Sequence, residues 1–336
     1  MSMIELTEGQ PVSPDGLIME WIDVPFGPFF PGLPGGLGLD MSLDGDSVAK
    51  VSAHSLVSAG ELLAEGATPP EKFVERLAAM SPLSPVSYRQ LACLALESAA
   101  KQEVASSDAT ARAAAVERER IASHLGWLAN LGAQTGFAML ERRATNLELT
   151  IRDANMDHIA ALDPEIASLL ARLRKSHMLR DKLSGTGHID HCSATSGPVA
   201  RASGKDDDAR SDDATYIGLG FATVTGSGGD AAARLEQRLA EIEQSCELIA
   251  KAEHLSLPEP AKIGAASGEG EAVVETPRGA ARLTLTLTDG MVTAADIGTP
   301  TAAHFTLIEA ITQHAEIADA LIAVGSLDLS PWEMRP

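Results

Sequence analysis

The C-terminal tail carries two chemically capable side chains at close spacing. Ser330 and Glu333 lie in the stretch SLDLSPWEMRP, residues 326 to 336, which follows an apolar, helix-like run. A hydroxyl and a carboxylate three positions apart can donate and accept protons or offer oxygen ligands. The spacing raises the question of whether the tail belongs to a site, and of which side chains would complete it.

A second cluster lies in the stretch GHIDHC, where His188, Asp190, His191 and Cys192 fall within five residues. Imidazole, carboxylate and thiolate are all ligands of zinc and related metals. The stretch lacks the second, spaced half that is typical of zinc sites. We therefore expect no metal on this chain, and we keep His188, His191 and Cys192 only as a weak metal candidate.

The composition limits the class of protein. The 336 residues are 45% hydrophobic, and their mean hydropathy is close to zero. No apolar stretch reaches the roughly 20 residues that cross a bilayer, and the first ten residues lack the features of a signal peptide, so a cytoplasmic location is expected. A formal charge of −21 argues against nucleic acid and anionic lipid as partners. Three separated cysteines without a CxxC spacing predict neither a disulfide framework nor a thiolate metal site.

The elements that would position these residues are mainly helical. Residues 22–38 are rich in Pro and Gly and are expected to form a loop without regular structure. Alternating stretches around Asp44-Gly45 and Asp289-Gly290 predict two hairpins. Residues 196–216 are predicted to be a polar connection. Apolar residues at helical spacing predict helices over 70–80, 85–101, 107–143, 156–183, 230–253 and 305–323.

These elements predict an α+β fold, predominantly α-helical, in which a helical bundle is flanked by small β-hairpins. We expect a single domain over residues 1–336, because no linker is long enough to separate two. It comprises an N-terminal loop and hairpin region (1–69), a helical core (70–256), a second hairpin region (257–304) and a C-terminal helix with its tail (305–336).

Several motifs, in this order along the chain, resemble the large subunit of [NiFe] hydrogenases. The branch they resemble most is shared by membrane-bound hydrogenases and the quinone-site subunit of respiratory complex I, the NADH dehydrogenase of respiration. The resemblance spans nearly the whole chain and implies a large-subunit-like fold packed against an iron–sulfur small subunit. The motifs are ERERIASHLGWL (117–128), GPVARASGKDDDAR (197–210), GDAAARLEQRLAEIEQS (229–245), VETPRGAARLTLTLTDGMV (274–292), IGTPT (297–301) and GSLDLSP (325–331).

The family's nickel–iron centre is held by two pairs of cysteines, and this chain has none of them. The first pair falls on Ser81 and Ser84, and the C-terminal pair falls on Ser330 and Glu333. A nickel–iron centre demands soft thiolate ligands, which Ser and Glu do not replace. The resemblance thus answers the question about the tail. The tail matches part of a metal site that has lost its ligands, and hydrogen activation is not expected.

The quinone-binding residues of complex I are replaced as well. The resemblance puts Pro34 at the position of the quinone-binding His and Pro82 at that of the quinone-binding Tyr. A Pro side chain neither donates nor accepts a hydrogen bond, so these two positions do not support complex I-type quinone chemistry.

Other family positions keep polar residues, which we take as cavity or interface candidates. Arg278 matches the arginine that faces the metal in hydrogenases, but it could simply cap a strand turn and pair with Glu275. Glu117, Arg120 and His124 share one helix face and favour a buried polar network. Arg201 and Arg210 are expected to anchor the acidic loop KDDD. The candidates are Arg278, Glu275, Glu117, Arg120, His124, Arg201, Arg210 and Asp328.

Three functions remain open. The chain could be a metal-free structural and coupling subunit of a complex I-like or formate hydrogenlyase-like complex, a subunit that binds quinone or another small redox substrate in the former metal cavity, or a maturation scaffold for hydrogenases. No cofactor is expected on this chain itself, apart from quinone in the second case. The expected partners are an iron–sulfur small subunit and proton-translocating membrane subunits, which would hold the chain at the cytoplasmic face of the inner membrane.

Overall fold

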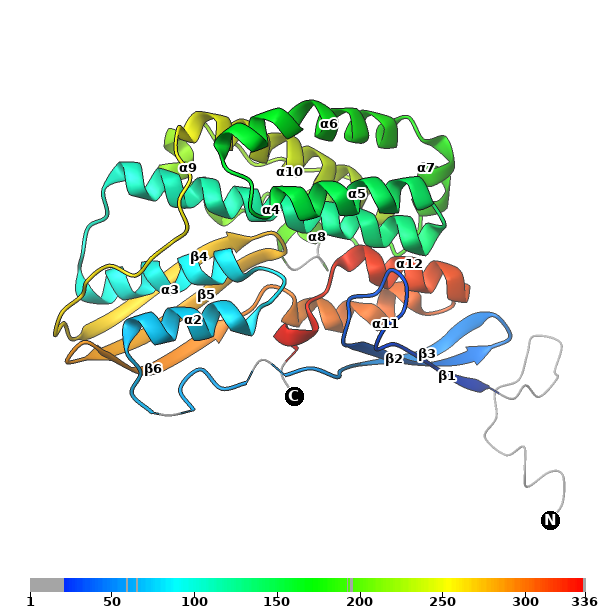
Figure 1. Cartoon of the computed structure of the whole chain (residues 1–336). Coiled ribbons are helices and arrows are strands. Elements are labelled where there is room, and N and C mark those ends of the chain that lie inside the picture. Colours follow the sequence, from blue (N-terminus) through cyan, green and yellow to red (C-terminus); the bar gives the residue numbers. More distant parts are fainter. Residues whose placement is uncertain (1–20, 59, 65, 192, 194–195, 335–336) are drawn as a thin grey trace, which may run out of the picture.

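The computed structural model describes residues 21–58, 60–64, 66–191, 193 and 196–334. A layer of long helices lies over two small antiparallel sheets, which are found beneath it at opposite ends (Figure 1). The fold is therefore α+β and dominated by helices, as predicted. No helix among the described residues is long and apolar enough to span a membrane.

The helical layer is built around α4 (Ser106–Thr135), which packs against α5 (Ala138–Ile151) and α10 (Ala231–Ala252). The predicted helix 107–143 is in fact two helices, because Gly136 takes a left-handed conformation, with φ +77°, and ends α4. The predicted helix 156–183 is also divided. Its parts are α6 (Met156–Arg174) and α7 (His177–Leu183), and the side chain of Ser176 caps the start of α7.

The first sheet contains β1 (Ile22–Phe26), β2 (Leu37–Asp44) and β3 (Ser47–Ser55) in that order. The hairpin predicted around Asp44-Gly45 is present as β2 and β3. The expectation that 22–38 has no regular structure was wrong for residues 22–26, because β1 pairs antiparallel with β2 along its whole length, and for residues 37–38, with which β2 begins. Pro25 is tolerated there since β1 is an edge strand.

Two C-terminal helices follow the second sheet. The predicted helix 305–323 is divided into α11 (Leu307–Thr312) and α12 (Ile317–Leu327), after a short 3-10 turn η2 (Ala302–Thr306). Both helices share a hydrophobic core with β2 and β3, and α12 also packs against α4 and α10. This places the C-terminal tail, including η3 (Pro331–Glu333), between the two sheets (Figure 1).

The second sheet contains β4 (Gly268–Thr276), β5 (Gly279–Thr288) and β6 (Met291–Gly298). The predicted hairpin is present: Asp289 and Gly290 both have positive φ, at +50° and +77°. One further strand was not predicted. The stretch before Asp289 folds as two strands, β4 and β5, which are joined by the turn at Pro277 and Arg278.

One face of the second sheet is covered by α2 (Pro70–Met80) and α3 (Pro85–Ala100), and the three elements share a hydrophobic core. The backbones of α3 and β4 come very close at Gly270, where an added Cβ would lie 2.1 Å from the carbonyl oxygen of Ala95. The join between α2 and α3 is therefore held at a fixed place beside the sheet.

The predicted polar connection 196–216 contains short helices: α8 (Gly197–Ala202), the 3-10 turn η1 (Ala209–Asp212) and α9 (Ala214–Gly218). They bring Arg201 and Arg210 to buried positions under the helical layer. Of its charged residues, Arg201, Asp208 and Arg210 are buried, whereas Asp206, Asp207 and Asp212 are exposed to solvent.

Candidate functional site

The four positions that match the family's metal ligands lie in one buried region. Ser81 ends α2, Ser84 begins α3, and Ser330 and Glu333 come from the tail. Each of these residues is at most 3% exposed. The Ser81 hydroxyl donates to Glu333 Oε1 at 3.5 Å, so the first former ligand pair touches the second. We call Ser81, Ser84, Ser330 and Glu333 the former ligand positions.

The Glu333 carboxylate is held by donors from three segments. The Tyr88 hydroxyl donates to Oε1 at 2.8 Å, and the backbone N–H and hydroxyl of Thr301 donate to Oε2 at 3.0 and 2.8 Å. Burial, and then the neighbouring Glu333 charge, raises the pKa of Tyr88 well above its ordinary value. Tyr88 therefore stays protonated and acts as a hydrogen-bond donor.

The sequence analysis did not identify Tyr88 or Thr301. Tyr88 lies one helical turn after Ser84 on α3, and this spacing was the available local signal. Thr301 lies at the end of the motif IGTPT, and its hydroxyl also accepts from the backbone N–H of Ser330 at 3.2 Å. Tyr88 and Thr301 thus bind the tail residues Glu333 and Ser330 in the former ligand region.

Arg278 lies beside the same region, on the turn between β4 and β5. Its Nη2 donates to Asp328 Oδ1 at 2.9 Å and its Nε to the Asp328 carbonyl at 3.1 Å, while Nη1 donates to the Ser84 hydroxyl at 3.2 Å. The expected pairing with Glu275 was wrong, because Arg278 points toward the tail while Glu275 is bound by Arg201. Arg278 thus links Ser84, of the first former ligand pair, to Asp328 at the start of the tail.

The donor set does not fit a nickel–iron centre. Three hydroxyls and one carboxylate occupy the former ligand positions, where a centre of that type requires soft thiolates. The Glu333 carboxylate is already engaged by Tyr88 and Thr301, and the Ser84 hydroxyl by Arg278. No chemistry of such a centre follows from these residues.

A cavity of about 550 Å³ adjoins the former ligand positions. Pro34 and Pro82, which match the quinone-binding positions of complex I, both line it, as do Arg278 and Asp328. Pro34 and Pro82 offer no side-chain donor, so the polar groups of this cavity come from other residues.

Glu119 is one polar residue of the cavity that the sequence analysis missed. Its carboxylate accepts from the backbone N–H groups of Val86 and Ser87 at 2.6 and 2.8 Å, in the first turn of α3. Burial raises the pKa of Glu119, although these hydrogen bonds oppose the shift. A carboxylate from α4 thus supplies the N-terminal capping bonds of α3 and fixes the position of Ser84.

A buried polar network lies on the other side of the β4–β5 turn, centred on Glu117. Its carboxylate accepts hydrogen bonds from Arg120, Arg210, Tyr216 and Ser245, at distances between 2.6 and 3.3 Å. These charges overcome the cost of burial and lower the pKa of Glu117 to about 2. The helix face predicted to form a buried polar network does form one.

A second part of this network is centred on Arg201. Its guanidinium lies 2.9 Å from Glu241, 2.7 Å from Glu275 and 3.1 Å from Asp208. Arg210 contacts Asp208 at 2.6 Å, so both arginines hold the acidic loop, the arrangement expected from the sequence. The loop is thereby tied to β4 and α10.

His124 joins the network through Glu241, whose Oε2 lies 3.0 Å from Nε2 of His124. Burial lowers the pKa of His124 to about 4, so the ring is neutral and donates from Nε2 to the ionised Glu241. The charges of this network are therefore paired with one another within the protein. The network therefore holds its side chains in fixed positions, and it provides no site at which a ligand could bind and be exchanged.

The GHIDHC stretch forms no comparable cluster. His188, Asp190 and His191 are exposed, and Cys192 lies outside the described residues. The described part of the chain contains no group of three or more His, Cys, Asp or Glu side chains arranged to hold a metal ion. The weak metal candidate therefore gains no geometric support from the described residues.

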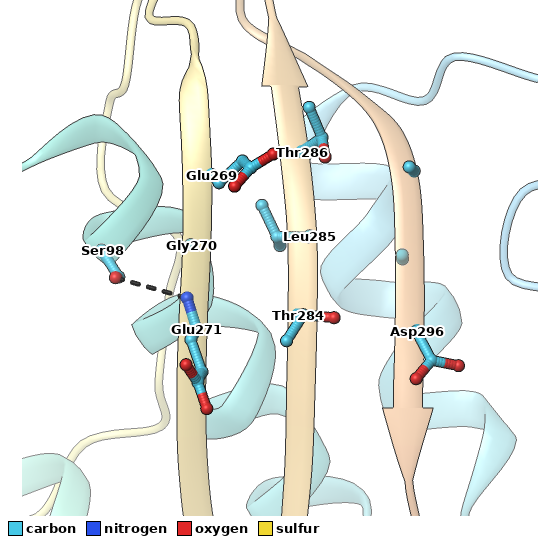
Figure 2. A pocket seen from close by; sticks show the side chains of 10 residues that line it. Ser98, Glu269, Gly270, Glu271, Thr284, Leu285, Thr286 and Asp296 are labelled. Atoms are coloured by element: carbon cyan, nitrogen blue, oxygen red, sulfur yellow. Dashed lines mark hydrogen bonds between the residues drawn. The ribbon is translucent and has the colours of Figure 1, made fainter.

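A separate hollow of about 570 Å³ lies on the outer face of the second sheet. Figure 2 shows the side chains of Glu269, Glu271, Thr284, Thr286 and Asp296 on this face, and the hydrogen bond between the Glu271 N–H and Ser98. None of the residues predicted from the sequence to form a site lines it. We regard it as the solvated face of the sheet.

Comparisons with known proteins show which families and structures this chain is similar to. Residues 111–263, which span α4 to the end of the helical layer, match the family described as respiratory-chain NADH dehydrogenase, 49 Kd subunit. A D-type subunit of NADH-quinone oxidoreductase from Desulfotalea psychrophila is 29% identical over 90% of this chain and 94% of its own length. The chain is thus similar to the 49 Kd, or D-type, subunits of respiratory NADH-quinone oxidoreductase.

Two further proteins are similar to this chain, one in sequence and one in structure. Another D-type subunit of NADH-quinone oxidoreductase, from Chloroherpeton thalassium, is 31% identical over 67% of this chain, which spans 60% of that relative. A chain in the structure of the membrane-bound sulfane sulfur reductase, an archaeal respiratory membrane complex, has a TM-score of 0.84 at 19% identity, and the match covers 94% of this chain and 98% of that one. The latter similarity concerns the fold alone.

Proposed function

We propose that this chain is a metal-free structural and coupling subunit of a membrane-associated redox complex, of the complex I or formate hydrogenlyase type. Its partners would be an iron–sulfur small subunit and proton-translocating membrane subunits, which hold it on the cytoplasmic face of the inner membrane. The names of its relatives, NADH-quinone oxidoreductase subunits, support a redox complex that acts on quinone.

The observation that carries the proposal is the closed state of the former ligand positions. Glu333 accepts hydrogen bonds from Tyr88 and Thr301, and Ser84 accepts one from Arg278. Three of the four former ligand side chains therefore have partners within this chain, while the buried Ser330 hydroxyl has none among the described residues. Such a region keeps its shape without a cofactor, which is what a docking and coupling role requires.

The network around Glu117 and Arg201 supports the same role. It joins α4, α10, β4 and the acidic loop through buried ion pairs. Buried charged groups that satisfy one another fix a geometry, although they add little net stability. A rigid scaffold can transmit movement between a cluster-bearing subunit and a membrane arm without chemistry of its own.

The proposal is tested by gentle purification of the tagged chain from its native membranes. Co-purifying subunits are identified by mass spectrometry, and nickel, iron and quinone are measured in the same sample. We expect an iron–sulfur subunit and membrane subunits, with iron but without nickel. A stoichiometric nickel content, or the absence of any small-subunit homologue, would refute the proposal. A soluble chain accompanied only by maturation proteins would favour the scaffold function instead.

A second candidate function follows from the 550 Å³ cavity. Its volume lies within the range of small-molecule sites, and Arg278 and Asp328 place a charged pair on its wall beside Pro34 and Pro82. The cavity could hold a quinone or another small redox substrate, with Arg278 as the donor in place of the absent His and Tyr. Glu333, on the far side of the former ligand positions, would be the proton-transferring residue.

The two functions are separated by variants of the purified complex. If the cavity binds the substrate, Arg278→Lys should lower quinone reduction by about tenfold, because Lys does not reproduce the planar, forked guanidinium. Glu333→Gln should lower it as well, by removing the titratable carboxylate. Glu269→Gln, on the outer face of the second sheet, serves as the control. Unchanged turnover in both test variants would remove the catalytic function and leave the structural one.

A further inference from the structure

A pocket of about 920 Å³ lies on the side of the tail away from the quinone-position prolines. Its walls are the loop that follows β3, the end of α2, the end of β6 and residues 332–334. The loop and the tail are joined directly, since the Ser55 hydroxyl donates to the Pro331 carbonyl at 2.8 Å. The structural function proposed above does not use this pocket, and the second candidate function uses only Glu333 of its lining.

The charges that line the pocket are negative. Glu61 and Glu333 contribute carboxylates, whereas no Lys or Arg is among the described residues that line it. The one histidine of this lining, His54, lies 3.3 Å from Asp40 at the rim. The pocket thus favours a positive ligand and disfavours an anionic one.

Glu333 distinguishes this pocket from a mere group of surface acids. The residue is 3% exposed, and the donors to its carboxylate, Tyr88, Ser81 and Thr301, are all neutral. No ion pair joins Glu333 to a basic side chain within the part of the chain that the structure describes. A buried carboxylate without a counter-charge attracts a cation more strongly than an exposed one does, because less water screens it.

Much of the remaining wall is apolar, although Ser55, Ser58 and Thr299 also line it. Trp332 adds an aromatic ring next to Glu333 in the chain. Apolar walls with one buried charge and one aromatic ring suit a cation that carries an apolar body. The volume exceeds what a single ammonium group would fill. The other apolar side chains that line the pocket are Val57, Leu62, Leu63, Met80, Ala295, Ile297 and Met334.

We propose that this pocket binds a small organic cation, an ammonium or guanidinium group on an apolar body, with its charge beside Trp332 and Glu333. The carboxylate and the indole supply the attraction for the charge, and the apolar walls bury the body. This site is distinct from the cavity that Pro34 and Pro82 line, although Trp332 borders both.

The test uses the purified full chain and three probes of equal length: hexylamine, hexanol and hexanoate. Isothermal titration at neutral pH measures binding, and the tryptophan emission, to which Trp332 contributes, reports the same event. We expect saturable binding of hexylamine, at least about tenfold weaker binding of hexanol, and no binding of hexanoate. Equal binding of hexylamine and hexanol would mean simple apolar partitioning and would overturn the proposal, as would a lack of saturable binding.

Two variants locate the site. Glu333→Gln should weaken hexylamine binding by about tenfold or more, because it removes the buried charge. Met334→Arg places a cation on a half-buried pocket wall without touching the carboxylate, and it should abolish binding even if Glu333→Gln does not fold. Glu269→Gln removes an acid outside the pocket and should leave binding unchanged. Undiminished binding by the folded Met334→Arg variant would place the cation elsewhere and contradict the proposal.

Discussion

The Tyr88 hydroxyl donates a 2.8 Å hydrogen bond to the Glu333 carboxylate, although the two residues are 245 positions apart in the chain. This bond joins the start of α3 to the C-terminal tail at the former ligand positions. Both residues are buried, at 1% and 3% exposed, so the bond is shielded from water. The tail therefore owes its position to a specific polar contact as well as to apolar packing.

Replacing Tyr88 with Phe should lower the free energy of unfolding by about 1–3 kcal/mol, because a buried carboxylate then loses one of its donors. Urea denaturation followed by circular dichroism measures the change. Ser81→Ala is a matched comparison, since its contact with Glu333 is long, at 3.5 Å, and should cost less. An equal cost for both variants would contradict the assignment of Tyr88 as the principal donor to Oε1.

Glu117→Gln should destabilise the protein by about 3–5 kcal/mol, because Arg120 and Arg210 then lose the charge that compensates their burial. The midpoint of urea unfolding reports the change. Glu243→Gln provides the exposed control: its pair with Arg174 lies at the surface and should contribute less than about 1 kcal/mol. A similar small effect in both variants would show that the network around Glu117 is not electrostatically coupled.

The protein should lose stability as the pH falls from about 6.5 to 4. Burial lowers the pKa of both His124 and His304 from 6.5 to about 4, so the unfolded chain binds more protons than the folded chain in this window. Each histidine contributes about 3 kcal/mol that is fully present above pH 6.5 and lost on acidification. Unfolding free energies measured across pH 4 to 7 give the slope.

The same slope should be shallower in His124→Gln, since the amide does not titrate. His158→Gln, at an exposed helical position, should keep the slope of the wild-type protein. A slope that His124→Gln leaves unaltered would mean that the pKa of this histidine does not differ between the folded and the unfolded chain, and would contradict the prediction.

Gly270→Ala should destabilise the protein by about 1–3 kcal/mol, because its Cβ would lie 2.1 Å from the Ala95 carbonyl oxygen and would push α3 away from β4. Thermal or urea unfolding measures the loss. At Gly298 the nearest atom to an added Cβ is 3.8 Å away, so Gly298→Ala should be close to neutral. Tolerance of alanine at Gly270 would indicate that the α3–β4 contact is less rigid than described.

The sequence predicted the type of most elements but not all of their ends. Helical periodicity continues across Gly136 and Ser176, since apolar residues on both sides keep the helical spacing. The breaks depend on one left-handed glycine and one capping serine. The strand β1 was missed because its apolar pattern is interrupted by Pro25, and its pairing with β2 is a tertiary contact that no local pattern contains.

The sequence predicted the candidate site residues that lie in family motifs. It missed the residues that are brought to the site by contacts between segments far apart in the sequence. The former ligand positions follow from aligned motifs, and the structure places them together. Tyr88, Thr301 and Glu119 were missed because each contacts a segment that is far away in the sequence. For the same reason the partner of Arg278 was predicted to be the nearby Glu275, whereas the fold brings it to Asp328.

The polar contacts around the former ligand positions can form only late in the synthesis of the chain. Tyr88 and Arg278 leave the ribosome before Asp328 and Glu333, to which they are bound in the folded protein. Domains fold largely as their chain emerges, so most of the helical layer can form while these donors still lack their acceptors. The contacts of Glu333 at the former ligand positions can therefore form only after residue 333 has been synthesised.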